Sequence, residues 1–220
     1  MEHGVSVQIF RSREAWLEAR KNTIGGSDAA AVLGVCPCMS NVDFWEIKTG
    51  QKKQKDVSGN SLVQYGTKAE APLRELFGLD HDEMAVHYYE NNLFTNDDYP
   101  WAHYSADGWL FDNTTGEFGI LEIKTAEMIG QSSWLKWENG IPLPYVCQIT
   151  HGLAVTDAAF VIVKAQLKYW KEDRLFITTR EYRYEREQLE GDIKYLMTAE
   201  EQFWEGVQLH KRPPLILPQI

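Results

Sequence analysis

Apolar positions recur at helical spacing in several stretches of the chain, and residues typical of helix ends bound these stretches. Ser12 is a suitable N-cap for the first of them, and Ser40 with Asp43 has the spacing of a capping box. A longer helix is expected over residues 61–78, where Pro72 predicts a kink or a second helix start. The expected helices are 12–21, 27–34, 40–50, 61–78, 130–139, a segment from Pro142 and Pro144 to about Val155, and 185–208.

Strands are indicated by β-branched and aromatic runs between turn residues. AAFVIVKA (158–165) is an unbroken apolar run, typical of a strand buried on both faces, and RLFITTREY (174–182) is its expected partner. NTTG (113–116) predicts a hairpin turn. The expected strands are 84–90, 101–111, 118–124, 158–165 and 174–182. The sequence therefore predicts an α/β fold with a mixed central sheet flanked by helices on both sides.

Size and cysteine usage narrow the class of protein. A chain of 220 residues with 44% hydrophobic and 25% charged residues is expected to form one domain with a sizeable core. We expect no membrane segment and no secretory signal, because no apolar run is long enough and the N-terminus is polar. Cys36, Cys38 and Cys147 make no zinc-binding pattern, so we expect free thiols and a cytoplasmic location.

The net charge of −10 argues against a basic surface that binds nucleic acid non-specifically. It does not exclude an enzyme that acts on DNA, because divalent cations bound at an acidic site reverse the local field. The polar, lysine-rich stretch 51–60 is either a solvated loop or a contact to the DNA backbone, and the sequence alone favours neither.

One strand carries a charge pattern that needs an explanation. In GILEIKTA (119–126), alternation places the side chains of Glu122 and Lys124 on the same face. A cross-strand ion pair is the simple interpretation. The alternative is the active site of a metal-dependent phosphodiesterase, and the choice between them depends on what else points to this place.

A second carboxylate favours the active site. Asp107 lies in WAHYSADGWLF, on the strand that the hairpin turn joins to Glu122. Mg²⁺ and Mn²⁺ prefer such hard oxygen ligands, with the Ile123 carbonyl as a third oxygen and Glu70, on the preceding helix, completing the metal shell. Lys124 would then lie beside the attacking water or hold the scissile phosphate.

Four blocks of the sequence carry a family resemblance: REAWLEARKNTIGGSDAAAVLG, YGTKAEAPLRELF, SADGWLFDNTTGEFGILEIKTA and LPYVCQITHGLAVTDAAFVIV. Over about residues 12–165 the chain resembles the YqaJ-like viral recombinase family, which includes the lambda-type phage exonucleases of the PD-(D/E)XK nuclease superfamily. The resemblance implies a restriction-endonuclease-like core and a single nuclease domain over 1–220. Helices in 12–50 would contribute the phosphate-binding part, residues 61–182 the core, and 185–208 a C-terminal helix.

The resemblance also implies roles for individual residues. Asp107 and Glu122, with the Ile123 carbonyl, match the central metal ligands, and Lys124 matches the catalytic lysine. Glu70 matches a helix glutamate that holds or orients the metal site. Gln148, in PYVCQITHG, matches a glutamine that contacts the active site. The residues that match those binding the 5′-terminal phosphate are Arg20, Ser27 and Ser105. Physically, Ser27 as an expected helix N-cap and Arg20 with its planar fork both suit an anion.

The implied activity is that of a 5′→3′ exodeoxyribonuclease that uses Mg²⁺ or Mn²⁺, with two ions expected. It would resect duplex DNA ends to 3′ single-stranded overhangs and release 5′-mononucleotides. The implied setting is a homotrimer, encoded by a phage or prophage, that acts in the bacterial cytoplasm with a phage single-strand annealing protein. Two alternatives stay open: an endonuclease of the same fold, and a non-catalytic DNA-end-binding protein.

Overall fold

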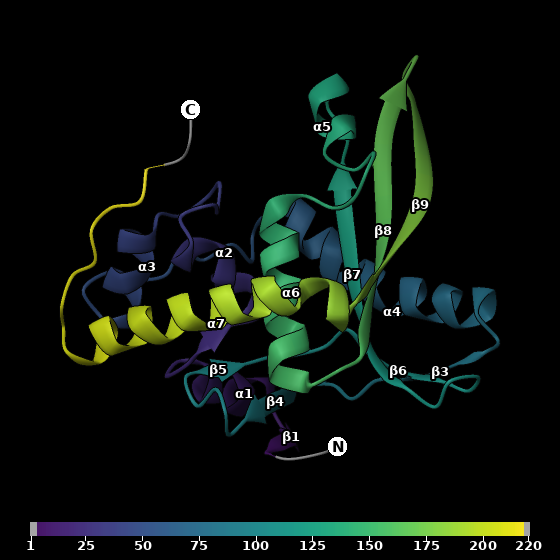
Figure 1. Ribbon diagram of the computed structural model, residues 1–220. Coiled ribbons are helices and arrows are strands. Elements are labelled where there is room, and N and C mark those ends of the chain that lie inside the picture. The colour runs from purple at the N-terminus through teal and green to yellow at the C-terminus, as the bar shows by residue number, and fades with distance from the viewer. Residues whose placement is uncertain (1–3, 218–220) are drawn as a thin grey trace.

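A computed structural model describes residues 4–217, and its main sheet has five strands in the order β3-β6-β7-β8-β9 (Figure 1). Neighbours β7 and β8 are parallel, whereas the other neighbouring pairs are antiparallel. The sheet is therefore mixed, as predicted. Its strands are β3 (Met84–His87), β6 (Gly108–Asp112), β7 (Phe118–Glu127), β8 (Phe160–Lys171) and β9 (Arg174–Glu185).

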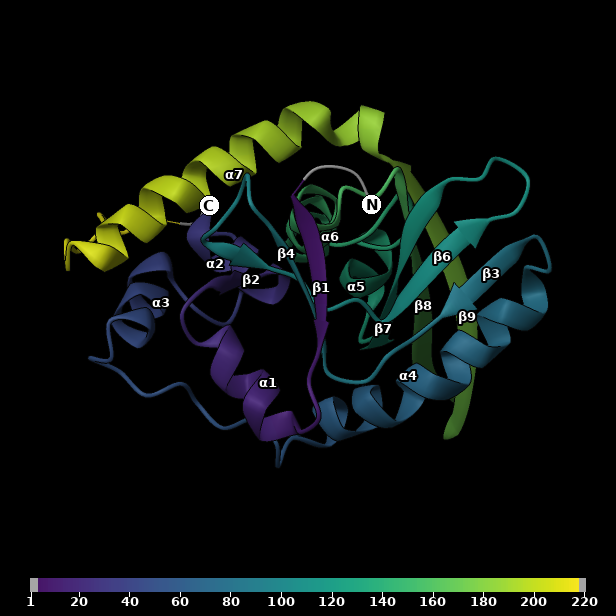
Figure 2. The same ribbon diagram turned by 90° about the horizontal axis from the view of Figure 1, so that it is seen from below.

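Strands β7 and β8 are buried on both faces over most of their first halves, because helices cover each side of the sheet. Ile120 of β7 packs in one apolar cluster, which includes residues of α6 (Leu143–Thr156) and α7 (Arg186–Gln208). Its neighbour Leu121 packs in a second cluster, with Leu73 and Phe77 of α4 (Ser61–Asp80). Figure 2 shows α4 and α7 on opposite sides of the sheet. This packing explains the unbroken apolar runs.

Two small sheets hold the N-terminal part of the chain. Strand β1 (Val5–Ile9) pairs antiparallel with β4 (Asn92–Asn96), and β2 (Ile24–Gly25) pairs parallel with β5 (Ala102–His103). The nearby helices are α1 (Arg13–Arg20), the 3₁₀ turn η1 (Gly26–Asp28), α2 (Ala29–Val32) and α3 (Asn41–Lys48). Phe44 of α3 stacks on Phe203 of α7, with ring centroids 5.2 Å apart, and so ties this part to the rest of the molecule.

Most of the expected elements are confirmed. Ser12 caps α1, and Ser40 and Asp43 form the capping box of α3. Gly116, at φ +76°, provides the left-handed residue of the hairpin turn between β6 and β7. Helix α4 runs through Pro72 without a break, so the second helix start is wrong. The expected helix at 130–139 is the shorter α5 (Gln131–Leu135).

The expected single strand at 101–111 is wrong, because the chain changes sheets there. Strand β5 ends at His103, and Tyr104 then makes an isolated antiparallel bridge with Phe94. Only at Gly108 does the chain enter the main sheet as β6. Strands β1 and β4 were not predicted, since each is short and finds its partner far away in the sequence.

The three cysteines, Cys36, Cys38 and Cys147, are free thiols, as predicted, and the expected cytoplasmic location stays a prediction. Cys36 and Cys38 place their Sγ atoms 2.9 Å apart. Within residues 4–217, no helix has both the length and the apolar character that a bilayer crossing requires.

Candidate active site

The β6–β7 hairpin brings the two predicted carboxylates to one place. Asp107 immediately precedes β6, and Glu122 lies in the middle of β7. Asp107 Oδ2 accepts a hydrogen bond from the backbone N–H of Ile123 at 2.8 Å, which fixes the aspartate against the neighbouring strand. The Ile123 side chain packs in the core, and the role of its carbonyl as a metal ligand stays a prediction.

Glu122 is the centre of a dense hydrogen-bond network. Its Oε1 accepts from Lys124 Nζ at 2.5 Å and from Gln148 Nε2 at 2.5 Å, while Gln148 Oε1 accepts from the same lysine at 2.9 Å. Its Oε2 accepts from the hydroxyl of Tyr104. The Glu122 side chain is only 3% exposed, so each of these donors helps to hold a charge that water does not reach.

Tyr104 was missed by the sequence analysis. It is fully surrounded by protein, and a Cβ atom on Gly26 or on Gly152 would lie less than 3.0 Å from its ring. The two glycines therefore make room for the ring that carries the hydroxyl to Glu122. No local pattern separates this tyrosine from an ordinary core tyrosine, although its position three residues before Asp107 is a weak signal.

Helix α4 contributes Glu70 and Arg74 to the same region. Glu70 lines the cavity described below, and burial raises the pKa of its carboxyl. Arg74, also missed by the sequence analysis, donates from Nη1 to the backbone carbonyl of Asp107. Its guanidinium carbon lies 3.6 Å from the ring centroid of Tyr88, a cation–π contact that fixes the side chain.

The electrostatics of the group favour a bound cation. Burial, followed by the negative charge of Glu122, raises the pKa of Asp107 well above its ordinary value. Burial alone would lower the pKa of Lys124, but the carboxylates of Glu122 and Asp107 more than offset this effect and raise it. The charged form of Asp107 is thus disfavoured beside Glu122 unless a further positive charge lies near, and a bound cation would supply that charge.

The donor set suits a divalent cation. Within residues 4–217, Asp107 Oδ1 accepts no hydrogen bond, and Glu122 Oε2 accepts only the one from Tyr104, so lone pairs stay available on both side chains. Carboxylate oxygens are the ligands that Mg²⁺ prefers. In the same part of the chain, no three His, Cys, Asp or Glu side chains converge as a metal-binding group. The protein's candidate side-chain ligands are therefore Asp107 and Glu122, and Glu70 as a ligand stays a prediction.

A cavity of about 460 Å³ joins this group to the predicted phosphate-binding residues. The predicted site residues that line it are Arg20, Ser27, Glu70, Ser105, Asp107 and Gln148. Residues separated by more than 120 positions in the sequence thus share one concave surface, the usual form of a binding site. Glu122 and Lys124 lie behind it, in contact through Gln148.

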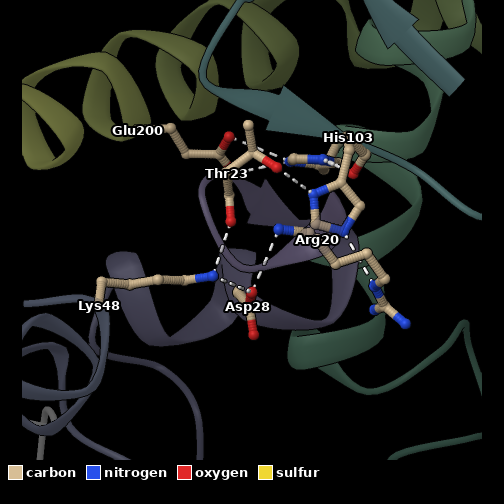
Figure 3. Close-up of polar contacts among 8 residues, drawn as sticks. Arg20, Thr23, Asp28, Lys48, His103 and Glu200 are labelled. Atoms are coloured by element: carbon tan, nitrogen blue, oxygen red, sulfur yellow. Dashed lines mark hydrogen bonds and ion pairs between the residues drawn. The ribbon is translucent and has the colours of Figure 1, made fainter. Parts of the chain in front are cut away.

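The predicted phosphate-binding side chains differ in how many of their hydrogen-bonding groups are already used within the protein. Arg20 ends α1, with its guanidinium 4.1 Å from the Trp16 ring centroid and its Nε donating to His103 (Figure 3). The Ser105 hydroxyl donates to the Asn92 carbonyl at 2.6 Å and accepts from Trp16 Nε1 at 3.2 Å, so most of its hydrogen-bonding capacity is used.

The expected N-cap role of Ser27 is wrong. Ser27 is exposed in the middle of η1, and the N-cap of α2 is Asp28. The Asp28 carboxylate accepts from the backbone N–H of Gly25 at 3.1 Å, and this contact closes the turn instead. The exposed hydroxyl of Ser27 nevertheless lines the cavity on the same side as Arg20.

The mixed sheet, with two carboxylates and a lysine on its central hairpin, defines a protein with the PD-(D/E)XK restriction-endonuclease-like fold, as predicted. The chain belongs to the YqaJ-like viral recombinase family, whose domain model matches residues 15–159.

One relative is similar to the chain in sequence, and two solved structures are similar to it in fold. The uncharacterized protein YqaJ of Bacillus subtilis (strain 168) is 26% identical over 167 residues, covering 73% of this chain and 50% of YqaJ. The chain thus spans about half the length of that relative. The alkaline exonuclease LHK-Exo from Laribacter hongkongensis is 20% identical, with 90% of this chain and 96% of that chain covered and a TM-score of 0.62. A phage-related exonuclease from Haemophilus somnus 129PT is 13% identical, with coverages of 86% and 95% and a TM-score of 0.51. At these identities the two solved structures show the shared fold.

Proposed function

We propose that the chain is a metal-dependent 5′→3′ exodeoxyribonuclease that resects duplex DNA ends to 3′ single-stranded overhangs and releases 5′-mononucleotides. The observation that carries this proposal is that one cavity is lined both by Asp107 and Gln148 and by Arg20 and Ser27. Membership of the YqaJ-like family supports it, as does the likeness to LHK-Exo, which was also solved in complex with dAMP.

The group around Glu122 would act on the scissile phosphate. Lys124, which donates to Glu122 and Gln148, would hold the attacking water or stabilise negative charge that develops on the phosphate. Gln148 and Tyr104 would keep the Glu122 carboxylate in a fixed orientation during this step. When bound by Asp107 and Glu122, one or two Mg²⁺ or Mn²⁺ ions would supply Lewis-acid polarisation of the phosphate and lower the pKa of water.

Arg20, Ser27 and Ser105 would bind the 5′ end of the strand. Arg20 offers a planar fork of donors to a terminal phosphate, and Ser27 offers a hydroxyl. Ser105 would assist with the hydrogen-bonding capacity that remains to it. Because a new 5′-phosphate forms after each cleavage, these residues would bind the shortened strand again and favour successive cleavage steps.

The family supports further proposals about the setting of the reaction. We propose a homotrimer that acts on duplex ends in the cytoplasm of a bacterial host, encoded by a phage or prophage. A phage single-strand annealing protein would be its partner, since the overhang that the enzyme exposes is the substrate of such a protein.

The test uses a linear duplex with one 5′ end phosphorylated and the other hydroxylated, and a different internal fluorophore near each end. Incubation with Mg²⁺ should release labelled mononucleotides first from the phosphorylated end, and a Glu122→Gln, Lys124→Met double variant should release none. Internal fragments without end preference would support the endonuclease instead. DNA binding without cleavage in either metal would leave the non-catalytic alternative.

A further inference from the structure

The phosphate-binding arginine is held by residues that the proposed function has not used. Arg20 Nε donates to His103 Nε2 at 3.1 Å, and its guanidinium lies over the face of Trp16. Within residues 4–217, neither terminal nitrogen of Arg20 donates a hydrogen bond to a protein atom. Figure 3 shows these nitrogens pointing away from His103. His103 therefore contacts the Nε atom and Trp16 covers one face of the guanidinium. The two terminal nitrogens are left free to bind a ligand in the cavity.

The hydrogen bonds of His103 define its protonation state. An arginine N–H can only donate, so Nε2 of His103 must be the acceptor. The proton then lies on Nδ1, which donates to Thr23 Oγ1 at 2.8 Å. Burial, and after it the charge of Arg20, lowers the pKa of His103 to about 2, so the ring stays neutral at any physiological pH. A neutral ring of this tautomer offers one lone pair, and that lone pair points at Arg20.

The backbone around His103 fixes the ring in place. Gly25 is paired with His103 between β2 and β5, and a Cβ atom on this glycine would lie 2.8 Å from His103 Nε2. Only glycine therefore lets the ring sit close enough to Arg20 at this position. Lys48 Nζ donates to the Thr23 carbonyl at 2.6 Å and lies 3.6 Å from the Asp28 carboxylate, which steadies the turn that carries Thr23 (Figure 3).

A buried ion pair supports His103 from the opposite side. The His103 carbonyl accepts from His151 Nε2 at 2.9 Å, and His151 Nδ1 lies 2.9 Å from Glu200 Oε1 of α7. Both side chains of the pair are 0% exposed. Burial opposes the charge on His151, but Glu200 outweighs it and raises the pKa of His151. The backbone of His103 is thus anchored to α7 through a charged pair.

We propose that His103 is the positioning residue of the phosphate site: its Nε2 orients the Arg20 guanidinium so that both terminal nitrogens face the 5′-phosphate of the strand. This inference rests on the proposed function, because it assigns the preference for phosphorylated ends to a residue that does not contact the phosphate. It predicts that the acceptor at the Nε2 position, rather than the aromatic ring, determines the preference.

Three substitutions separate these possibilities. His103→Gln can place an acceptor near the Nε2 position, His103→Asn can reach only the Nδ1 position towards Thr23, and His103→Leu fills the space without any acceptor. His87→Gln, at an exposed histidine of β3, is the matched control. Binding of a short single-stranded oligonucleotide, with and without a 5′-phosphate, is measured in a chelator by fluorescence anisotropy. Thermal unfolding of each variant shows whether it is folded.

The preference for the phosphorylated oligonucleotide should fall about tenfold in His103→Leu and His103→Asn, the size expected for a charge-assisted contact. It should be kept largely in His103→Gln and fully in His87→Gln. In an Arg20→Ala background, His103→Leu should cause no further loss. An unchanged preference in His103→Leu, equal weakening of both oligonucleotides, or an added loss without Arg20 would overturn the proposal. If the His103 variants behave as expected but the wild-type protein never cleaves DNA, the proposed nuclease activity is refuted and the role of His103 in phosphate binding is supported.

Discussion

Replacement of Lys124 by methionine tests whether the central charges of the site are structural, functional or both. In the metal-free protein, Lys124 Nζ lies 2.5 Å from Glu122 Oε1, with the two side chains 14% and 3% exposed. Removal of one partner of a buried ion pair typically costs about 3–5 kcal/mol, because the remaining charge stays in a low-dielectric site. Gln148 and Tyr104 still donate to Glu122, so we expect the lower value, about 3 kcal/mol.

This loss converts into a measurable change in unfolding temperature. For a chain of this size, 1 kcal/mol corresponds to about 2–4 °C in Tm, so Lys124→Met should lower the Tm of the metal-free protein by roughly 6–12 °C. A second change, Glu122→Gln, removes the charge that lost its partner. The double variant should therefore recover most of the Tm, and neither variant should cleave DNA.

Thermal unfolding in a chelator, followed by tryptophan fluorescence, measures both effects, and mononucleotide release measures activity. Lys52→Met is the matched control, because the Lys52–Asp43 pair has side chains 49% and 37% exposed and its loss should leave Tm nearly unchanged. An unchanged Tm in Lys124→Met would refute the buried ion pair. Cleavage by the double variant would refute the catalytic role of the two charges.

Four further predictions follow, three from the candidate site and one from a histidine outside it. Chelation should abolish mononucleotide release, and added Mg²⁺ should restore it in the wild type but not in Asp107→Asn; release that persists in a chelator would contradict the metal dependence. Arg20→Ala should lower kcat/KM about tenfold or more on 5′-phosphorylated ends while hydroxylated ends change little, whereas an equal loss on both would indicate a general structural role. Burial opposes protonation of His81, but Glu83 and Glu181 outweigh it and raise its pKa above 6.5, so its stabilisation is complete below about pH 6.5 and is lost as the pH rises through the folded-state pKa. The difference in urea midpoint between the wild type and His81→Gln should accordingly shrink from pH 6 to pH 9, and a constant difference would contradict this. Gly25→Ala should reduce the preference for phosphorylated ends by displacing the His103 ring, whereas Gly59→Ala, with no atom within 4 Å of the added Cβ, should leave it intact.

The parts of the site that the sequence predicted are those encoded by local patterns. Alternation along β7 places Glu122 and Lys124 on one face, and the turn after β6 brings Asp107 beside them. The caps Ser12 and Ser40 likewise define the starts of α1 and α3, and Gly50 follows the end of α3. Strand β4 and the break between β5 and β6 were missed because they depend on pairing between distant segments, which no short pattern contains.

The site residues Arg74 and Tyr104 were missed for the same physical reason. Arg74 and Tyr104 acquire their roles from contacts to the Asp107 carbonyl and the Glu122 carboxylate, formed only after the helices pack on the sheet. Ser27 lines the cavity together with Arg20, but its expected role as a helix N-cap is wrong, since the N-cap of α2 is Asp28. The Asp28 carboxylate makes no side-chain cap to α2 and instead accepts from the backbone N–H of Gly25, so the local preference for a serine cap was not used here.

The glycine pair at 25–26 packs against two consecutive side chains of the candidate site, those of His103 and Tyr104. Gly25 makes room for the ring of His103, and Gly26 makes room for the ring of Tyr104. His103 and Tyr104 are consecutive, yet the first contacts Arg20 and the second contacts Glu122. The backbone of this dipeptide is held by pairing with β2, by the bridge to Phe94 and by the hydrogen bond from His151. One short piece of backbone, held at three places, therefore fixes the relative position of these two contacts, which is what the proposed stepwise cleavage would need.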